Sequence, residues 1–177
     1  MPRPLVALLL GLAVLAGVVP ATAAPTTAAA SRSEAAWNAP LPGAPVVTRP
    51  FDPPPHRYGP GHRGVDLAAA PGSPVLAAGD GVVVFAGMVA GRPVVSVDHA
   101  GGLRTTYEPV RPSVGAGRTV ARGEPLGVLD PGHDGCPVTA CLHWGARRGE
   151  DYLDPLSLLR PPRLRLLPLV EATDHGR

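Results

Sequence analysis

Two short segments of this chain carry side chains that can ligate a metal ion. The first, Gly-His-Arg-Gly-Val-Asp, places His62 four residues before Asp66, with Gly64 between them where the backbone can bend. The second is Cys-Leu-His-Trp-Gly, in which Cys141 and His143 face the same side of an extended strand. If the segments meet, His62, Asp66 and His143 offer two imidazoles and one carboxylate. Three protein ligands with one open position are typical of a catalytic zinc.

The elements that must bring these segments together are short β-strands. The chain has 177 residues, of which 45% are hydrophobic but only 4% are aromatic, so its core must be built from Val, Leu and Ala. Valine-rich runs alternate with Gly, Pro and Asp turn signals, which favours an antiparallel sandwich or barrel. We expect strands at residues 75–78, 81–86, 93–99, 103–107, 125–129 and 141–147. The net charge of +2 gives no reason to expect nucleic acid as a partner.

The two ends of the chain differ in composition from its middle. Arg3 precedes an apolar run over residues 5–19, and Ala-Thr-Ala at residues 21–23 supplies a cleavage site, so residues 1–23 are predicted to be a signal peptide. The run is shorter than the ~20 residues of a membrane span, so no span is expected after cleavage. Residues 24–45 are predicted to be a disordered linker, residues 46–159 the domain and residues 160–177 a tail.

The only two cysteines, Cys136 and Cys141, lie five positions apart. In an exported protein a close pair indicates a disulfide, which here would hold the loop before the second segment. Two alternatives remain. Cys141 could be a fourth ligand beside His143, which would close the metal site and make it structural, or it could be a free thiol.

Five blocks follow one another in an order that resembles the lysostaphin and LytM-type zinc metalloendopeptidases, which cleave peptide bonds of peptidoglycan. The blocks are residues 62–67, 70–83, 95–107, 120–127 and 142–144. The resemblance implies an all-β fold with a curved antiparallel sheet, an open barrel-like sandwich with a metal groove across it. It implies Zn²⁺ held by His62, Asp66 and His143. It also implies a secreted protein of the bacterial envelope, with peptidoglycan as its partner and a monomeric state.

The chain departs from that family at two catalytic positions. The family usually has a Tyr-x-His motif, but here the segment is Tyr107-Glu108-Pro109. It also has a His-x-His pair, whose first position here is Cys141. Both missing histidines assist the attack on the peptide bond, and such general acid–base help contributes ~10²–10⁴ in rate.

Several residues are candidates to replace that function. His133, in the loop before the second segment, is the first choice, because the loop can fold over the metal. Glu108 adjoins one lost position, although strand alternation places it opposite Pro109. Tyr107 is predicted to face the groove and bind substrate, and Arg63 to hold a substrate carboxylate.

The leading hypothesis is therefore a secreted zinc metalloendopeptidase that acts on peptidoglycan, with His133, Tyr107 and Glu108 as catalytic candidates. The alternative is a catalytically degenerate zinc-binding module that binds the wall or regulates other wall hydrolases. Retained ligands favour the enzyme, and the two missing histidines favour the module.

Overall fold

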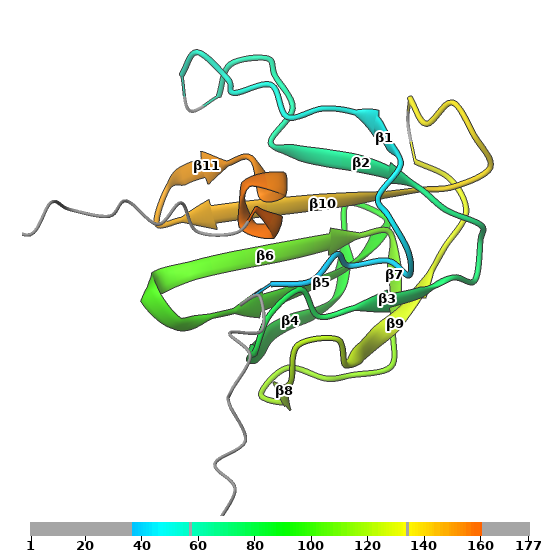
Figure 1. Cartoon of the computed structure of the whole chain (residues 1–177), viewed down its shortest axis with the longest axis vertical. Helices are drawn as coiled ribbons and strands as arrows, with labels where there is room; N and C mark the ends of the chain where they lie inside the picture. Colours follow the sequence, from blue (N-terminus) through cyan, green and yellow to red (C-terminus); the bar gives the residue numbers. More distant parts are fainter. Residues whose placement is uncertain (1–36, 57, 134, 161–177) are drawn as a thin grey trace, which may run out of the picture. The chain divides into compact units, whose positions relative to one another are not determined.

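A computed structural model describes residues 37–56, 58–133 and 135–160 (Figure 1). Within these residues the chain is all-β, as predicted, with only two short 3₁₀ helices, η1 (Ala100–Gly102) and η2 (Pro155–Leu159). The strands are β1 (Val47–Arg49), β2 (Gly64–Ala68), β3 (Pro74–Leu76), β4 (Gly81–Val89), β5 (Arg92–Asp98), β6 (Leu103–Glu108), β7 (Val110–Pro112), β8 (Thr119–Val120), β9 (Pro125–Leu129), β10 (Cys141–Arg148) and β11 (Asp151–Leu153).

The strands form two antiparallel sheets. The larger has the order β1-β2-β10-β6-β5-β4-β8, with β11 paired to β10, and the smaller has the order β3-β9-β7. The ends of the larger path, β1 and β8, do not pair with each other, so this sheet stays open. In Figure 1, β10 lies between β2 and β6. The sequence therefore predicted the class correctly, and its six expected strands correspond to β3, β4, β5, β6, β9 and β10.

Strand alternation separates a core face from an outer face. Along β6, Leu103, Thr105 and Tyr107 are buried, whereas the three residues between them are partly exposed. The core is built mainly from Val, Leu and Ala, as the composition predicted, with Trp144 and Tyr107 as its largest side chains. Alternate residues of β6 and β10 are therefore free to build a site on the outer face.

The segment before β1 packs more closely than predicted. Residues 37–45 were expected to belong to a disordered linker, but Leu41 is buried in the core and Trp37 packs against it. Backbone hydrogen bonds tie the segment to the domain, because the Asn38 N–H donates to the Ala78 carbonyl and the Leu76 N–H donates to the Pro40 carbonyl. The predicted signal peptide, residues 24–36 of the predicted linker and residues 161–177 of the predicted tail lie outside the described residues.

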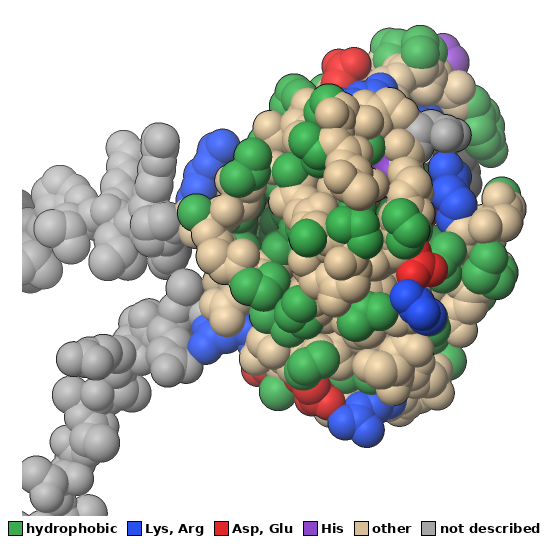
Figure 2. All heavy atoms as spheres, turned by 90° about the vertical axis from the view of Figure 1, so that its right-hand side faces the viewer, with side chains coloured by type: hydrophobic (Ala, Val, Ile, Leu, Met, Phe, Trp, Pro, Cys, Tyr) green, Lys and Arg blue, Asp and Glu red, His purple; other side chains and the backbone are tan. Residues whose placement is uncertain are grey.

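Among the residues that the structure describes, no helix is both long enough and apolar enough to cross a membrane. Figure 2 shows the side of the molecule that lies to the right in Figure 1. On this face several Arg side chains lie beside Asp or Glu side chains, with hydrophobic and other side chains between these groups. The face therefore presents charges of both signs and not a broad patch of one sign.

Candidate metal centre

The pairing of β2 with β10 brings the two ligand segments together. Asp66 and His143 are direct partners in this antiparallel ladder, and His62 lies just before β2, where it forms an isolated bridge with Asp52. Asp66 Oδ1 lies 3.0 Å from His62 Nε2 and 2.9 Å from His143 Nδ1. The two ring nitrogens are 3.0 Å apart. One donor atom from each of these three side chains thus converges on a single point, and this cluster could hold a metal ion.

The chemistry of these donors fits a bound cation. His62 Nδ1 lies 2.7 Å from the Pro50 carbonyl oxygen, so this nitrogen carries the proton and donates it there. In the neutral ring, Nε2 then has only a lone pair, which points at a carboxylate oxygen of Asp66. Asp66 Oδ2 is buried and has no hydrogen-bond partner among the described residues. Lone pairs that face one another in this way are stabilised when a cation lies between them.

The spacing also suits zinc. Ligand atoms about 2.0–2.2 Å from a tetrahedral ion lie about 3.3–3.6 Å from one another. The three separations in this cluster are 2.9 to 3.0 Å, so small movements of the side chains would admit the ion.

The carboxyl group of Asp66 is held in its charged form. Burial alone would raise its pKa. The hydrogen bond with His143 and the positive charges that His133, His62 and His143 carry when protonated oppose that effect and hold the pKa below its usual value. A charged carboxylate is the form that ligates a metal.

Gly64 has a steric role that differs from the predicted bend. It lies within β2 and pairs with Gly145 of β10. A Cβ atom at Gly64 would lie 2.5 Å from the Trp144 carbonyl oxygen and 2.8 Å from both Cε1 and Nε2 of His143. Glycine is therefore required at position 64 because the His143 ring occupies the space that any side chain would need.

His133 joins the cluster from the loop before β10. Its Nε2 lies 3.6 Å from Asp66 Oδ1, and its ring stacks on that of His143 at a centroid separation of 5.9 Å. The side chain is only 10% exposed, and its Nδ1 is buried without a hydrogen-bond partner in the described part of the chain. The structure thus places His133 beside the three candidate ligands, where the folded loop was predicted to bring it.

The expected disulfide is present. Cys136 and Cys141 are joined, with their Cα atoms 5.7 Å apart. The bond ties the loop that carries His133 to the first residue of β10. Because Cys141 is oxidised, it is neither a fourth metal ligand nor a free thiol, and those two alternatives are wrong.

The prediction for Tyr107 was wrong. It pairs with Trp144 across β6 and β10, and both side chains lie in the core. The hydroxyl of Tyr107 accepts hydrogen bonds from the Ala78 N–H at 3.0 Å and from the Thr105 hydroxyl at 2.9 Å. Burial raises its pKa, against the smaller lowering effect of these hydrogen bonds. Tyr107 therefore supports the sheet beneath the site and does not face the groove.

Glu108 lies on the site face, as the partner of His143 in the ladder. Its Oε1 is 2.6 Å from Nε of Arg92, so the carboxylate already neutralises a guanidinium group. Pro109 and Cys141 are both buried, and neither can carry a proton. Of the proton carriers considered from the sequence, His133 is the one that the structure brings within 4 Å of a candidate ligand.

A hollow beside His143 contains residues that the sequence interpretation overlooked. Its lining includes Arg63, which had been singled out, and also Arg104, Thr106 and Arg147. Arg147 lies four positions after His143, so strand alternation alone would have placed it on the same face. Arg104 could be found only once the register of β6 with β10 was known.

Comparison with known proteins agrees with this geometry. The model of peptidase family M23 matches residues 60–155, a segment that includes all three candidate ligands and His133. The chain belongs to peptidase family M23. The resemblance drawn from the order of the sequence blocks is thereby confirmed at the level of the family.

Two curated proteins are similar to parts of this chain. The uncharacterized Mycobacterium tuberculosis protein Rv2891 is 52% identical over 144 residues, which are 79% of this chain and 57% of that protein. The DD-carboxypeptidase/endopeptidase Mpg of Neisseria gonorrhoeae is 35% identical over 101 residues, which are 56% of this chain and 23% of that protein. The chain thus spans little more than half of the first relative and about a quarter of the second.

A solved structure has a similar fold. Csd3 of Helicobacter pylori superimposes with a TM-score of 0.58 at 27% identity, over 75% of this chain and 37% of that chain.

Proposed function

We propose that this chain is a zinc metalloendopeptidase of the bacterial envelope that hydrolyses peptide bonds of peptidoglycan. The observation that carries the proposal is the convergence of His62, Asp66 and His143, with an orphaned buried oxygen on Asp66. Membership of a peptidase family supports the reaction class. The name of the Neisseria relative, a DD-carboxypeptidase/endopeptidase, supports a wall peptide as substrate. The signal-like N-terminus supports export.

The residues of the chain have separable roles in this proposal. His62, Asp66 and His143 would hold the zinc ion, which supplies Lewis acidity and lowers the pKa of a bound water. The Pro50 carbonyl fixes the tautomer of His62. His133 is the proposed proton carrier, since its Nε2 faces the cluster and its ring is held by stacking on His143. From there it can take a proton from the attacking water and return it to the leaving amine.

The test is release of new amino termini from purified peptidoglycan by the zinc-loaded protein. His143→Ala should abolish release together with zinc binding. His133→Gln should keep about one zinc per chain but lower kcat by about 10²–10⁴. His56→Gln is the matched control, because His56 is an exposed histidine outside the cluster. Release that persists at the wild-type rate in His133→Gln would refute the role of His133.

One observation favours a second candidate, a zinc-binding module that binds the wall or regulates other wall hydrolases. Both positions where the family has assisting histidines hold residues that cannot titrate, Pro109 and the oxidised Cys141. A protein that binds zinc and sediments with peptidoglycan, yet releases no amino termini from walls of several cross-bridge types, would establish this module in place of the enzyme.

A further inference from the structure

The outer face of β6 and β10 continues away from the metal cluster as a groove lined by arginine. One hollow contains His143, Arg63, Arg104 and Arg147, and a second contains Arg104, Arg147 and Asp98. The hollows share Arg104 and Arg147 and therefore adjoin at this pair, and the two hollows together are here called the arginine groove. Each has a volume of about 190 Å³, so together they fall within the range of ligand pockets.

The register of the two strands explains the order of the side chains along the groove. His143 pairs with Glu108, Gly145 with Thr106, and Arg147 with Arg104. All six residues lie on the outer face, since strand residues alternate. Because Gly145 and Thr106 are small, the floor of the groove is open between the other two pairs. At about 3.4 Å per residue, the arginine pair lies about 14 Å along the strands from His143.

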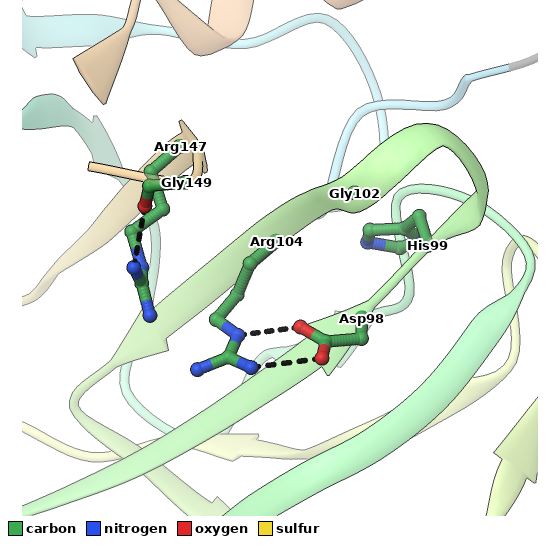
Figure 3. A pocket seen from close by; sticks show the side chains of 6 residues that line it. All are labelled: Asp98, His99, Gly102, Arg104, Arg147 and Gly149. Carbon is green, nitrogen blue, oxygen red and sulfur yellow. Dashed lines mark hydrogen bonds and ion pairs between the residues drawn. The ribbon is translucent and has the colours of Figure 1, made fainter. Parts of the chain in front are cut away.

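The charges along the groove are not balanced at its arginine end. Arg104 forms a bidentate ion pair with Asp98, drawn as two dashed lines in Figure 3. Arg147 extends into the same opening, and its Nη1 donates to the Gly149 carbonyl at 2.7 Å. That oxygen carries no formal charge. The group of Asp98, Arg104 and Arg147 therefore has one more positive charge than negative.

Arg63 adds a third guanidinium group to the groove, near the metal cluster. Arg63 donates to the Gly59 carbonyl at 3.1 Å, and its guanidinium lies 5.4 Å from the centroid of the Tyr152 ring. The ring and the carbonyl hold Arg63 half-buried beside His143. Glu108, the acidic residue in this part of the groove, is already paired with Arg92.

We propose that the arginine groove binds a free carboxylate of the peptide substrate, with Arg147 as the principal recognition residue. Guanidinium groups bind carboxylates through paired, charge-assisted hydrogen bonds. An extended peptide advances about 3.3–3.6 Å per residue, so about four residues span the distance of about 14 Å between His143 and the arginine pair. The recognised carboxylate therefore lies about four residues from the bond that is cleaved. This inference rests on the proposed function and adds to it a preference for acidic stem peptides over neutral glycine bridges.

The test compares synthetic stem peptides that end in D-Ala-D-Ala. One peptide has all its carboxyl groups free, and in the others one carboxyl at a time is converted to carboxamide. The zinc-loaded wild-type protein should hydrolyse the free peptide with a kcat/KM about ten- to a hundred-fold above that of one carboxamide form, which identifies the carboxyl concerned. Arg147→Gln should reduce that ratio to near one. Arg148→Gln is the matched control, because Arg148 is exposed and lies on the other side of β10, and it should keep the ratio.

A binding measurement separates failure of this inference from failure of the proposed peptidase. Titration calorimetry on the metal-free protein should show tighter binding of the free peptide than of the carboxamide, with the difference lost in Arg147→Gln. If the metal-free protein binds the peptides in this way but the zinc-loaded protein does not hydrolyse them, the peptidase would be overturned and the groove supported. Equal binding of both peptides, no binding of either, or a preference that survives in Arg147→Gln would overturn the groove. Stronger competition from a poly(glycerol phosphate) than from the free peptide would also overturn it, because the groove would then serve an anionic polymer.

Discussion

Replacement of Gly64 by alanine should disturb the metal centre far more than the size of a methyl group suggests. The new Cβ would lie 2.5 Å from the Trp144 carbonyl oxygen and 2.8 Å from two atoms of the His143 ring. The carbonyl belongs to the backbone of β10 and cannot rotate away. β2 and β10 must therefore move apart at this point, and the ring of His143 must also turn, which carries Nδ1 away from Asp66.

The expected magnitudes follow from these contacts. Overpacking of this kind costs about 1–3 kcal/mol in the free energy of unfolding. Misorientation of a metal ligand typically weakens metal binding by about 10–100-fold. Gly145→Ala is the matched control, since Gly145 pairs with Gly64 but its Cβ would meet no atom closer than 3.5 Å. Its zinc affinity and free energy of unfolding should stay close to those of the wild type.

Two assays separate the effects. Urea unfolding in the presence of a chelator measures the cost to the fold alone, because bound zinc would add its own stabilisation. Competition with a chromophoric chelator then measures the zinc affinity of each variant. If Gly64→Ala matched Gly145→Ala in both assays, the steric explanation for glycine at this position would be refuted, and with it the placement of the His143 ring against β2.

Three further predictions concern the support of the site. Tyr107→Phe leaves the buried Ala78 N–H without its acceptor and removes one of the two hydrogen-bond partners of the Thr105 hydroxyl, so urea unfolding should show a loss of about 1–3 kcal/mol while zinc affinity is unchanged. Joint replacement of Cys136 and Cys141 by serine opens a very short loop and should cost about 2 kcal/mol, again by urea unfolding. Burial lowers the pKa of His99, so the unfolded chain binds a proton that the folded chain does not. The free energy of unfolding of the metal-free protein should therefore fall as the pH drops below about 6.5, and His99→Gln should reduce that slope.

The convergence of His62, Asp66 and His143 could be predicted because strand alternation and the order of the blocks concern local sequence. The prediction that His143 and Asp66 lie side by side required only the assumption that their segments pair. The register of β2 with β10 makes these residues direct partners. The side of the sheet on which the Tyr107 side chain lies could not be predicted in the same way. A shift of one residue in the pairing of β6 with β10 exchanges the two faces, and no local pattern fixes that register. The observed register places Tyr107 opposite Trp144, in the core.

The packing of residues 37–45 against the domain could not be predicted from the sequence for a related reason. This segment has the Pro, Ala and Gly content of a linker, and it is held by single backbone hydrogen bonds and by Leu41 and Trp37. Trp37 stands edge-on to His99 at a centroid distance of 4.8 Å, a contact between residues 62 positions apart. Contacts over such separations leave no periodic signal in the sequence, so composition alone favoured disorder.

The replacement of a histidine by Cys141 has two consequences that must be considered together. It removes a proton carrier that the family usually has beside the metal. It also supplies one half of the disulfide to Cys136, which closes the loop that carries His133. His133 Nε2 then lies 3.6 Å from Asp66, with its ring stacked on that of His143. The residue that displaced one histidine therefore anchors the loop that brings another to the same ligands. For this reason the three retained candidate ligands and the missing family histidines do not contradict each other, and His133 is the residue on which the proposed catalysis depends.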